Sequence, residues 1–151
     1  MDELIITIDE IIKYGLNPNL DIANKERLLE KYLVKIYSLY FEILDGSDGI
    51  DYPDFDKSLL PNIRQNIESN FKNFGFYKIV IDMNDIYDMA ECGLGDAIDD
   101  LADITLDLLE VKWRIENNSL SDGLWYFKFI FYAHTQQHIL NLLNFIKQIE
   151  N

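Results

Sequence analysis

The first apolar positions of the chain recur three and four residues apart, which predicts an amphipathic helix over residues 3–14. These positions are Leu4, Ile5, Ile8, Ile11 and Ile12. Residues 4–8 taken alone also fit a β-strand, and this alternative stays open at the level of the sequence. Gly15 stands where a left-handed C-terminal cap belongs, and Pro18 lies just beyond it. We therefore expect the first helix to end at Gly15.

The same periodicity predicts further helices along the chain. They are expected over residues 21–44, 61–73, 95–116 and 122–149. Asp21 and Ser121 can serve as N-caps, Pro61 suits the first turn of a helix, and Gly75 can end one. The segment from Leu124 to Tyr132 is apolar nearly all round, which is typical of a helix at the centre of a bundle.

The connections between these helices carry weaker signals. Residues 76–81 are β-branched and aromatic and should be extended, but a single strand cannot satisfy its own edges, so we expect an extended connector. Residues 82–94 read as a loop. The acidic stretch 45–57 resembles a calcium-binding loop out of register, because Gly49 and Ile50 are adjacent, and turn chemistry explains it better.

These elements predict an all-α fold. At 151 residues the chain has the length of one domain, so we expect a single helical domain over residues 1–151. Its architecture should be a bundle of four or five helices, with the aromatic C-terminal helix at the centre.

Composition narrows the possible functions. The chain has 27 acidic against 13 basic side chains and a net charge of −14, which argues against binding to nucleic acid or to an anionic membrane surface. The most apolar run, 124–133, is ten residues long, whereas a membrane span needs about 20. The acidic start does not fit a secretory signal, so we expect a cytoplasmic protein.

One cysteine, Cys92, excludes an internal disulfide framework and a four-cysteine zinc site.

A run of acids without a base is the most unusual feature. The 33 residues between Lys78 and Lys112 contain ten acids and no base. Six of them fall within an arc of about 100° on the fourth predicted helix. We call this set the acidic stripe: Asp96, Asp99, Asp100, Asp103, Asp107 and Glu110. Like-charge neighbours on it should cost on the order of 1–3 kcal/mol in total. The stripe could be a solvated face, pair with bases of the second helix, hold a divalent cation, or face a basic partner.

His134 and His138 are the only histidines, and their spacing places both imidazoles on one face of the last helix. The interpretation we favour is structural: an imidazole among aromatic residues needs a hydrogen-bond partner, and an aspartate on a neighbouring helix would serve. The alternative is a site of two histidines and two carboxylates, Asp99 and Asp103, suited to zinc, iron or manganese. A Glu-x-x-His motif is missing, because Phe131 and Thr135 stand where the glutamates would be.

The C-terminal half resembles a bacterial family catalogued as domain of unknown function family 5063. The matching residues are Asp99 to Ile104, Asp107, Leu108, Trp125, Phe127, Phe131, His134 and His138. Upstream, residues 32–35 and 76–82 follow in plausible order, whereas Thr135 and Gln136 stand where that family tends to carry Trp-Gly. The resemblance implies a helical bundle without assigned chemistry.

A second resemblance is confined to one motif. Residues 99–103, Asp-Asp-Leu-Ala-Asp, look like the second carboxylate motif of the all-helical nucleotide pyrophosphohydrolases, which bind magnesium. Those enzymes also carry a Glu-x-x-Glu pair on an earlier helix, but Glu26 and Glu30 are four residues apart. This resemblance supplies half of a magnesium site.

Together these features favour a non-enzymatic acidic protein that binds a basic protein partner, most plausibly an immunity-like or antitoxin-like inhibitor of a toxin. We expect no metal and no cofactor. The predicted partner-binding residues are Asp96, Asp99, Asp100, Asp103 and Asp107 of the stripe, extended by Asp82, Asp85 and Asp88. The alternative is a metal-binding bundle or a metal-dependent nucleotide hydrolase that uses Asp99, Asp103, His134 and His138. A structural subunit of a larger assembly is a third possibility, and the oligomeric state stays open.

Overall fold

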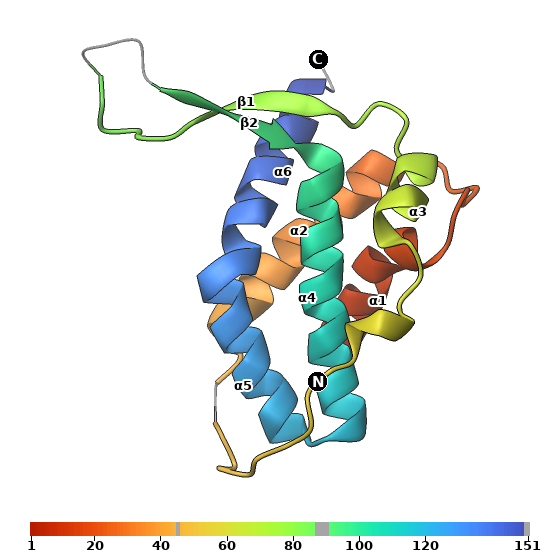
Figure 1. Ribbon diagram of the computed structural model, residues 1–151, viewed down its shortest axis with the longest axis vertical. Coiled ribbons are helices and arrows are strands. Elements are labelled where there is room, and N and C mark those ends of the chain that lie inside the picture. Colours follow the sequence, from red (N-terminus) through yellow and green to blue (C-terminus); the bar gives the residue numbers. More distant parts are fainter. Residues whose placement is uncertain (45, 87–90, 150–151) are drawn as a thin grey trace.

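The computed structural model describes residues 1–44, 46–86 and 91–149, which form a mainly helical molecule with one small sheet (Figure 1). The helices are α1 (Asp2–Leu16), α2 (Lys25–Glu42), α3 (Ile63–Asn70), α4 (Ala97–Asn117), α5 (Leu120–Ile130) and α6 (Gln136–Ile149). A 3₁₀ turn covers Lys57–Leu59, and a π-helical turn, Phe131–Thr135, joins α5 to α6. In the described part of the chain, no helix is both long and apolar enough to span a membrane.

The first predicted helix is confirmed, which excludes a strand at residues 4–8, but the role expected for Gly15 is wrong. Helix α1 runs through Gly15 to Leu16, and its C-cap is Asn17 in an extended conformation. Gly15 instead lies at a close approach between helices. A Cβ there would lie 2.7 Å from Cγ2 of Thr105 and 2.8 Å from Cγ2 of Ile63. The glycine therefore lets α1 pack tightly against α4 and α3.

Helix α4, not the C-terminal helix, lies at the centre of the bundle. It packs against α1, α3, α5 and α6, as Figure 1 shows. Its residues Leu101, Ile104 and Leu108 are fully buried. On α5 and the π turn, by contrast, Trp125 is 41% exposed and Tyr132 is 75% exposed. The aromatic C-terminal helix is therefore only half-buried, because its aromatic positions outnumber those that can face the core.

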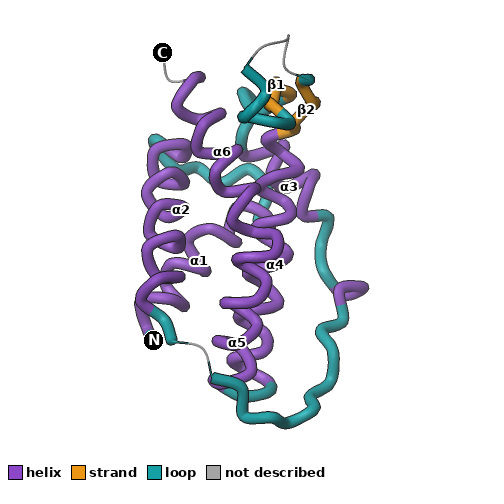
Figure 2. The backbone as a smooth tube through the Cα atoms, turned by 90° about the vertical axis from the view of Figure 1, so that its left-hand side faces the viewer, coloured by secondary structure: helices purple, strands orange, loops and turns teal. Residues whose placement is uncertain are grey.

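The expectation of an all-α fold needs correction, because the chain contains a β-hairpin. Strand β1 (Phe76–Val80) pairs antiparallel with β2 (Cys92–Asp96), in a register that runs from Phe76↔Asp96 to Val80↔Cys92. The segment 76–81, predicted to be an unpaired extended connector, is therefore hydrogen-bonded to β2 along residues 76–80. Sequence patterns missed β2 because Cys-Gly-Leu-Gly-Asp has little strand propensity. The hairpin lies at the end of the bundle where α4 begins (Figures 1 and 2).

Candidate metal centre

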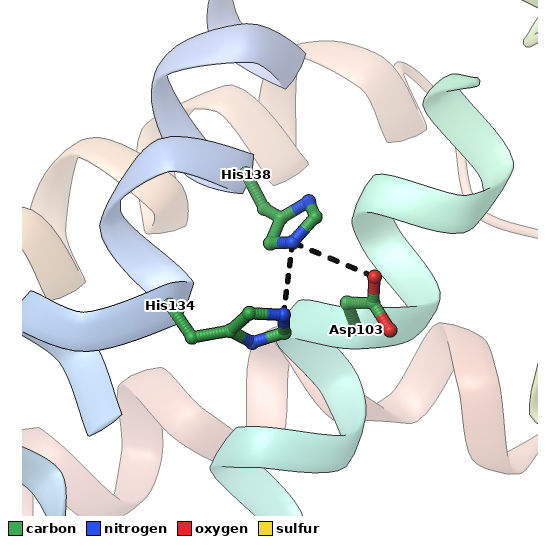
Figure 3. Close-up of side chains that lie close together, drawn as sticks. All are labelled: Asp103, His134 and His138. Atoms are coloured by element: carbon green, nitrogen blue, oxygen red, sulfur yellow. Dashed lines mark hydrogen bonds and ion pairs between the residues drawn. The ribbon is translucent and has the colours of Figure 1, made fainter. Parts of the chain in front are cut away.

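The two histidines lie where the C-terminal helix changes its winding. His134 belongs to the π turn, and His138 lies in the first turn of α6. Within the π turn the backbone N–H of Gln136 bonds the carbonyl of Phe131, five residues back. Such turns are rare, occur mostly as single turns within α-helices, and are frequent at functional sites. Both imidazoles face α4 (Figure 3).

His134 is held by a buried carboxylate of α4. Its Nδ1 lies 2.8 Å from Oδ2 of Asp107, a residue that is 5% exposed. The same oxygen accepts a hydrogen bond from the hydroxyl of Thr135 at 2.7 Å. An ionised carboxylate only accepts hydrogen bonds, so the Nδ1 of His134 carries the hydrogen. This leaves the Nε2 atom as the ring's acceptor.

His138 is held in the same way one helical turn further along. Its Nδ1 lies 2.7 Å from Oδ1 of Asp100, which is also 5% exposed. The second oxygen of Asp100 accepts a hydrogen bond from the hydroxyl of Tyr77 on β1. Asp100 is therefore occupied on both oxygens, and His138 likewise presents Nε2 as its free ring nitrogen.

The two Nε2 atoms face each other across 3.1 Å, and Oδ2 of Asp103 lies 3.5 Å from Nε2 of His138 (Figure 3). These three donor atoms all lie within 4.8 Å of one another. We call His134, His138 and Asp103 the metal triad. The side chains of its members are 44%, 23% and 32% exposed, respectively, so the triad opens to solvent on one side.

The electrostatic environment of the triad favours a cation. The hydrogen bond to Asp100 raises the pKa of His138 above its usual value of 6.5; burial opposes this, and the charges of Asp100, Asp103 and Asp107 reinforce it. Burial raises the pKa of the Asp103 carboxyl above its usual value; the charges of His138 and His134 oppose this rise, and those of Asp99 and Asp107 reinforce it. The ionised form of Asp103 is therefore energetically less favourable here than it is in water.

Five of the six residues of the acidic stripe lie on α4, whereas Asp96 is the last residue of β2 and the N-cap of α4. Much of the stripe is paired within the fold. Asp100 and Asp107 are buried against the histidines, and Glu110 is buried against Arg114 of the same helix, at 2.9 Å. These side chains are therefore not available to a partner in this conformation. The partners found for these carboxylates are His134, His138 and Arg114, and not the bases of α2, which was one of the interpretations that the sequence left open.

The other predicted partner-binding residues lie in different surroundings. Asp96 and Asp99 pair with Arg64 of α3, at 2.5 Å and 2.9 Å. Asp82 and Asp85 are exposed after β1, and Asp88 lies outside the described residues. Of the four residues of the metal-site alternative, Asp103, His134 and His138 have ligand atoms within 4.8 Å of one another, whereas Asp99 pairs with Arg64.

Sequence reasoning missed two supporting residues. The sequence marks Thr135 only as a departure from two motifs, yet its hydroxyl is fully buried against Asp107. The pattern predicts an extended connector at Tyr77, yet this residue bonds Asp100 across 23 residues of sequence. The tyrosine hydroxyl in an extended segment of mainly apolar residues is the available signal, but it gives no indication of its partner.

Comparisons of the chain with family models, curated proteins and solved structures find no match. The resemblance to domain of unknown function family 5063 therefore stays a prediction from the matching residues.

Proposed function

We propose that this protein binds a divalent transition metal through Nε2 of His134, Nε2 of His138 and the carboxylate of Asp103. The observation that carries the proposal is the pair of Nε2 atoms that face each other at 3.1 Å while both Nδ1 atoms are bonded to buried carboxylates. The proposal replaces the expectation of a protein without metal.

The spacing of the donor atoms suits a zinc-sized ion. Two nitrogen ligands at about 2.0–2.1 Å from zinc, at a tetrahedral angle, lie about 3.3–3.4 Å apart. The separations of 3.1 Å between the imidazoles and 3.5 Å between His138 and Asp103 bracket this value. The third separation, between Nε2 of His134 and the carboxylate of Asp103, is at most 4.8 Å, so one ion can reach all three ligands after side-chain movements.

The hydrogen bonds behind the ligands support the same interpretation. Two imidazole lone pairs that face each other repel, unless a proton or a metal ion lies between them. Metal-binding histidines almost always donate their other ring N–H to a carboxylate or carbonyl, which fixes the tautomer and raises ligand basicity. Asp107 and Asp100 supply this arrangement to His134 and His138.

The ligand set indicates which metals to expect. Two imidazoles and one carboxylate occur in catalytic zinc sites and in non-haem iron(II) sites, and both leave positions for water or another ligand. The partial exposure of the triad agrees with an open site rather than a closed structural one. Zinc, iron(II) and manganese(II) are therefore the metals to test.

Metal analysis and titration calorimetry test the proposal. We expect one zinc ion per chain, lost in His138→Ala and retained in Gln137→Ala, a control on the exposed side of the same helical turn. The affinity should fall at acidic pH, because protons compete for His138, whose pKa is raised. If the unaltered protein takes up neither zinc, iron(II) nor manganese(II) stoichiometrically, the imidazoles share a proton instead and the proposal fails.

Binding of a basic partner protein, as by an immunity-like inhibitor, is a second candidate. Asp82 and Asp85 favour it, because both are exposed on the connection after β1, next to the exposed apolar residues Ile81 and Met83. Such a surface combines charge with apolar area. A pull-down from the native host should recover a basic protein whose association slows in the double variant Asp82→Asn, Asp85→Asn. Unchanged association would remove these acids from the candidate surface.

A further inference from the structure

Tyr77 connects the β-hairpin to the metal triad. Its hydroxyl donates to one oxygen of Asp100, and the other oxygen of Asp100 accepts the Nδ1–H of His138. The hydroxyl of Tyr77 also interacts with the side chain of Asn141, which lies on α6 three residues after His138. A continuous chain of hydrogen bonds therefore runs from β1 through α4 to a proposed metal ligand.

The ring of Tyr77 packs closely between the hairpin and α6. Tyr77 pairs with Gly95 of β2, and a Cβ at Gly95 would clash with the tyrosine ring. On α6, Phe145 packs against the ring, with centroids 5.4 Å apart. Burial raises the pKa of Tyr77 well above its usual value, and the hydrogen bond to Asp100 reinforces the rise, so the hydroxyl stays a donor.

We propose that Tyr77 is a positioning residue of the metal centre, and that through it the β1–β2 hairpin and metal occupancy stabilise each other. The inference rests on the proposed function. Tyr77 fixes the Asp100 carboxylate, the carboxylate fixes the ring of His138, and the ring aims Nε2 at the ion. Such coupling is reciprocal, so an ion that tightens this chain of bonds also stabilises the strand that carries Tyr77.

Tyr77→Phe removes the hydroxyl and keeps the ring. Outer-shell partners of metal ligands contribute about 10–100-fold in affinity, and we expect a loss of roughly tenfold in zinc affinity for this variant. The visible spectrum of bound cobalt(II) should also change, because His138 is no longer held in one orientation. Tyr52→Phe is the matched control, since it removes a tyrosine–aspartate bond of 2.9 Å to Asp48, in the loop after α2, and should change neither quantity.

Gly95→Ala provides an independent test, because it displaces the tyrosine ring and keeps the hydroxyl. We expect the same direction of change in zinc affinity and in the cobalt spectrum. In Gly93→Ala, on the same strand, the atoms nearest to the new Cβ belong to the side chains of Ile79 and Ile81, so this variant should leave both quantities unchanged.

Hydrogen exchange tests the coupling in the opposite direction. Zinc should slow amide exchange in β1 and β2 of the unaltered protein, and should slow it markedly less in Tyr77→Phe. If Tyr77→Phe binds zinc as tightly as the unaltered protein, with the same cobalt spectrum and the same protection, Tyr77 has no positioning role and this inference is overturned while the metal site stands. If the unaltered protein binds no metal, the proposed function and this inference fall together.

Discussion

At the scale of single residues, neighbouring aspartates on α4 differ in burial and in the groups that they contact. Asp99 makes an exposed ion pair with Arg64, whereas Asp100 and Asp107 are buried acceptors of histidine N–H groups. Asp103 differs from all of them. Burial raises its pKa, so its ionised form is less favourable in the folded chain than in the unfolded chain, and its charge destabilises the metal-free protein at neutral pH. A residue that lowers stability in this way is typical of a functional site.

Replacement of Asp103 should separate stability from binding. In Asp103→Asn we expect the metal-free free energy of unfolding to stay equal or to rise, because the unfavourable charge is gone. Zinc affinity should fall at least about tenfold, because a ligand is lost. Denaturant unfolding and calorimetry measure the two quantities.

Asp107→Asn is the control, because it weakens buried hydrogen bonds from His134 and Thr135. It should reduce the metal-free free energy of unfolding by about 1–3 kcal/mol. A comparable loss in Asp103→Asn would contradict the role assigned to Asp103.

At the scale of elements, a buried ionic network joins α4 to α5. Arg114 contacts Glu110 at 2.9 Å and Asp122 at 3.2 Å, and the three side chains are between 9% and 12% exposed. The close crossing of these helices at Gly123 lies beside Ile115, where a Cβ would meet the backbone nitrogen at 2.9 Å. The network therefore fixes the sharp turn that places α5, and with it the histidines, along α4.

Removal of Arg114 from this network should lower the free energy of unfolding far more than removal of Arg64, which pairs with acids at the start of α4. Arg114→Met removes the arginine from two buried carboxylates, of which Glu110 keeps Lys57 at 3.6 Å and Asp122 keeps the Asn118 amide at 2.7 Å. We therefore expect a loss of about 3 kcal/mol in the free energy of unfolding, the lower end of the range for broken buried ion pairs. Arg64→Met breaks ion pairs in which the arginine side chain is 44% exposed, and should cost less than about 1 kcal/mol. Chemical denaturation of both variants compares them directly, and equal losses would refute the distinction.

At the scale of the whole molecule, acid–acid repulsion is the main electrostatic feature. The net charge is −14, and the internal pairs on α4 neutralise only part of the 27 acids. A large net charge destabilises a compact state through self-repulsion, and salt screens charges that are separated by more than about 10 Å at 0.1 M ionic strength.

Thermal stability should therefore increase with salt. Between about 0.01 M and 0.2 M sodium chloride we expect the Tm of the metal-free protein to rise by several degrees, since screening relieves repulsion between exposed acids. Differential scanning calorimetry measures this, and potassium chloride should give the same rise at equal ionic strength. A constant or falling Tm would show that attractive pairs outweigh the repulsion.

Much of the fold could be predicted from local patterns. Helical periodicity located the long helices, and the angular positions of the acids on α4 and of the two histidines follow from spacing alone. The hairpin could not be predicted, because its strands are separated in sequence and β2 is rich in glycine. The sequence also placed Gly15 at a helix end, because a cap and a close approach between helices require the same residue type.

The sequence by itself determined that His134 and His138 share one face, and that Asp99, Asp100, Asp103 and Asp107 share another. Only the tertiary structure decided that these two faces meet, that Asp103 rather than Asp99 completes the triad, and that Tyr77 stands behind it. The physical reason is that helical spacing fixes where a side chain lies around its own axis. Which element lies opposite depends on packing between segments that are distant in the sequence, and local periodicity carries no information about that packing.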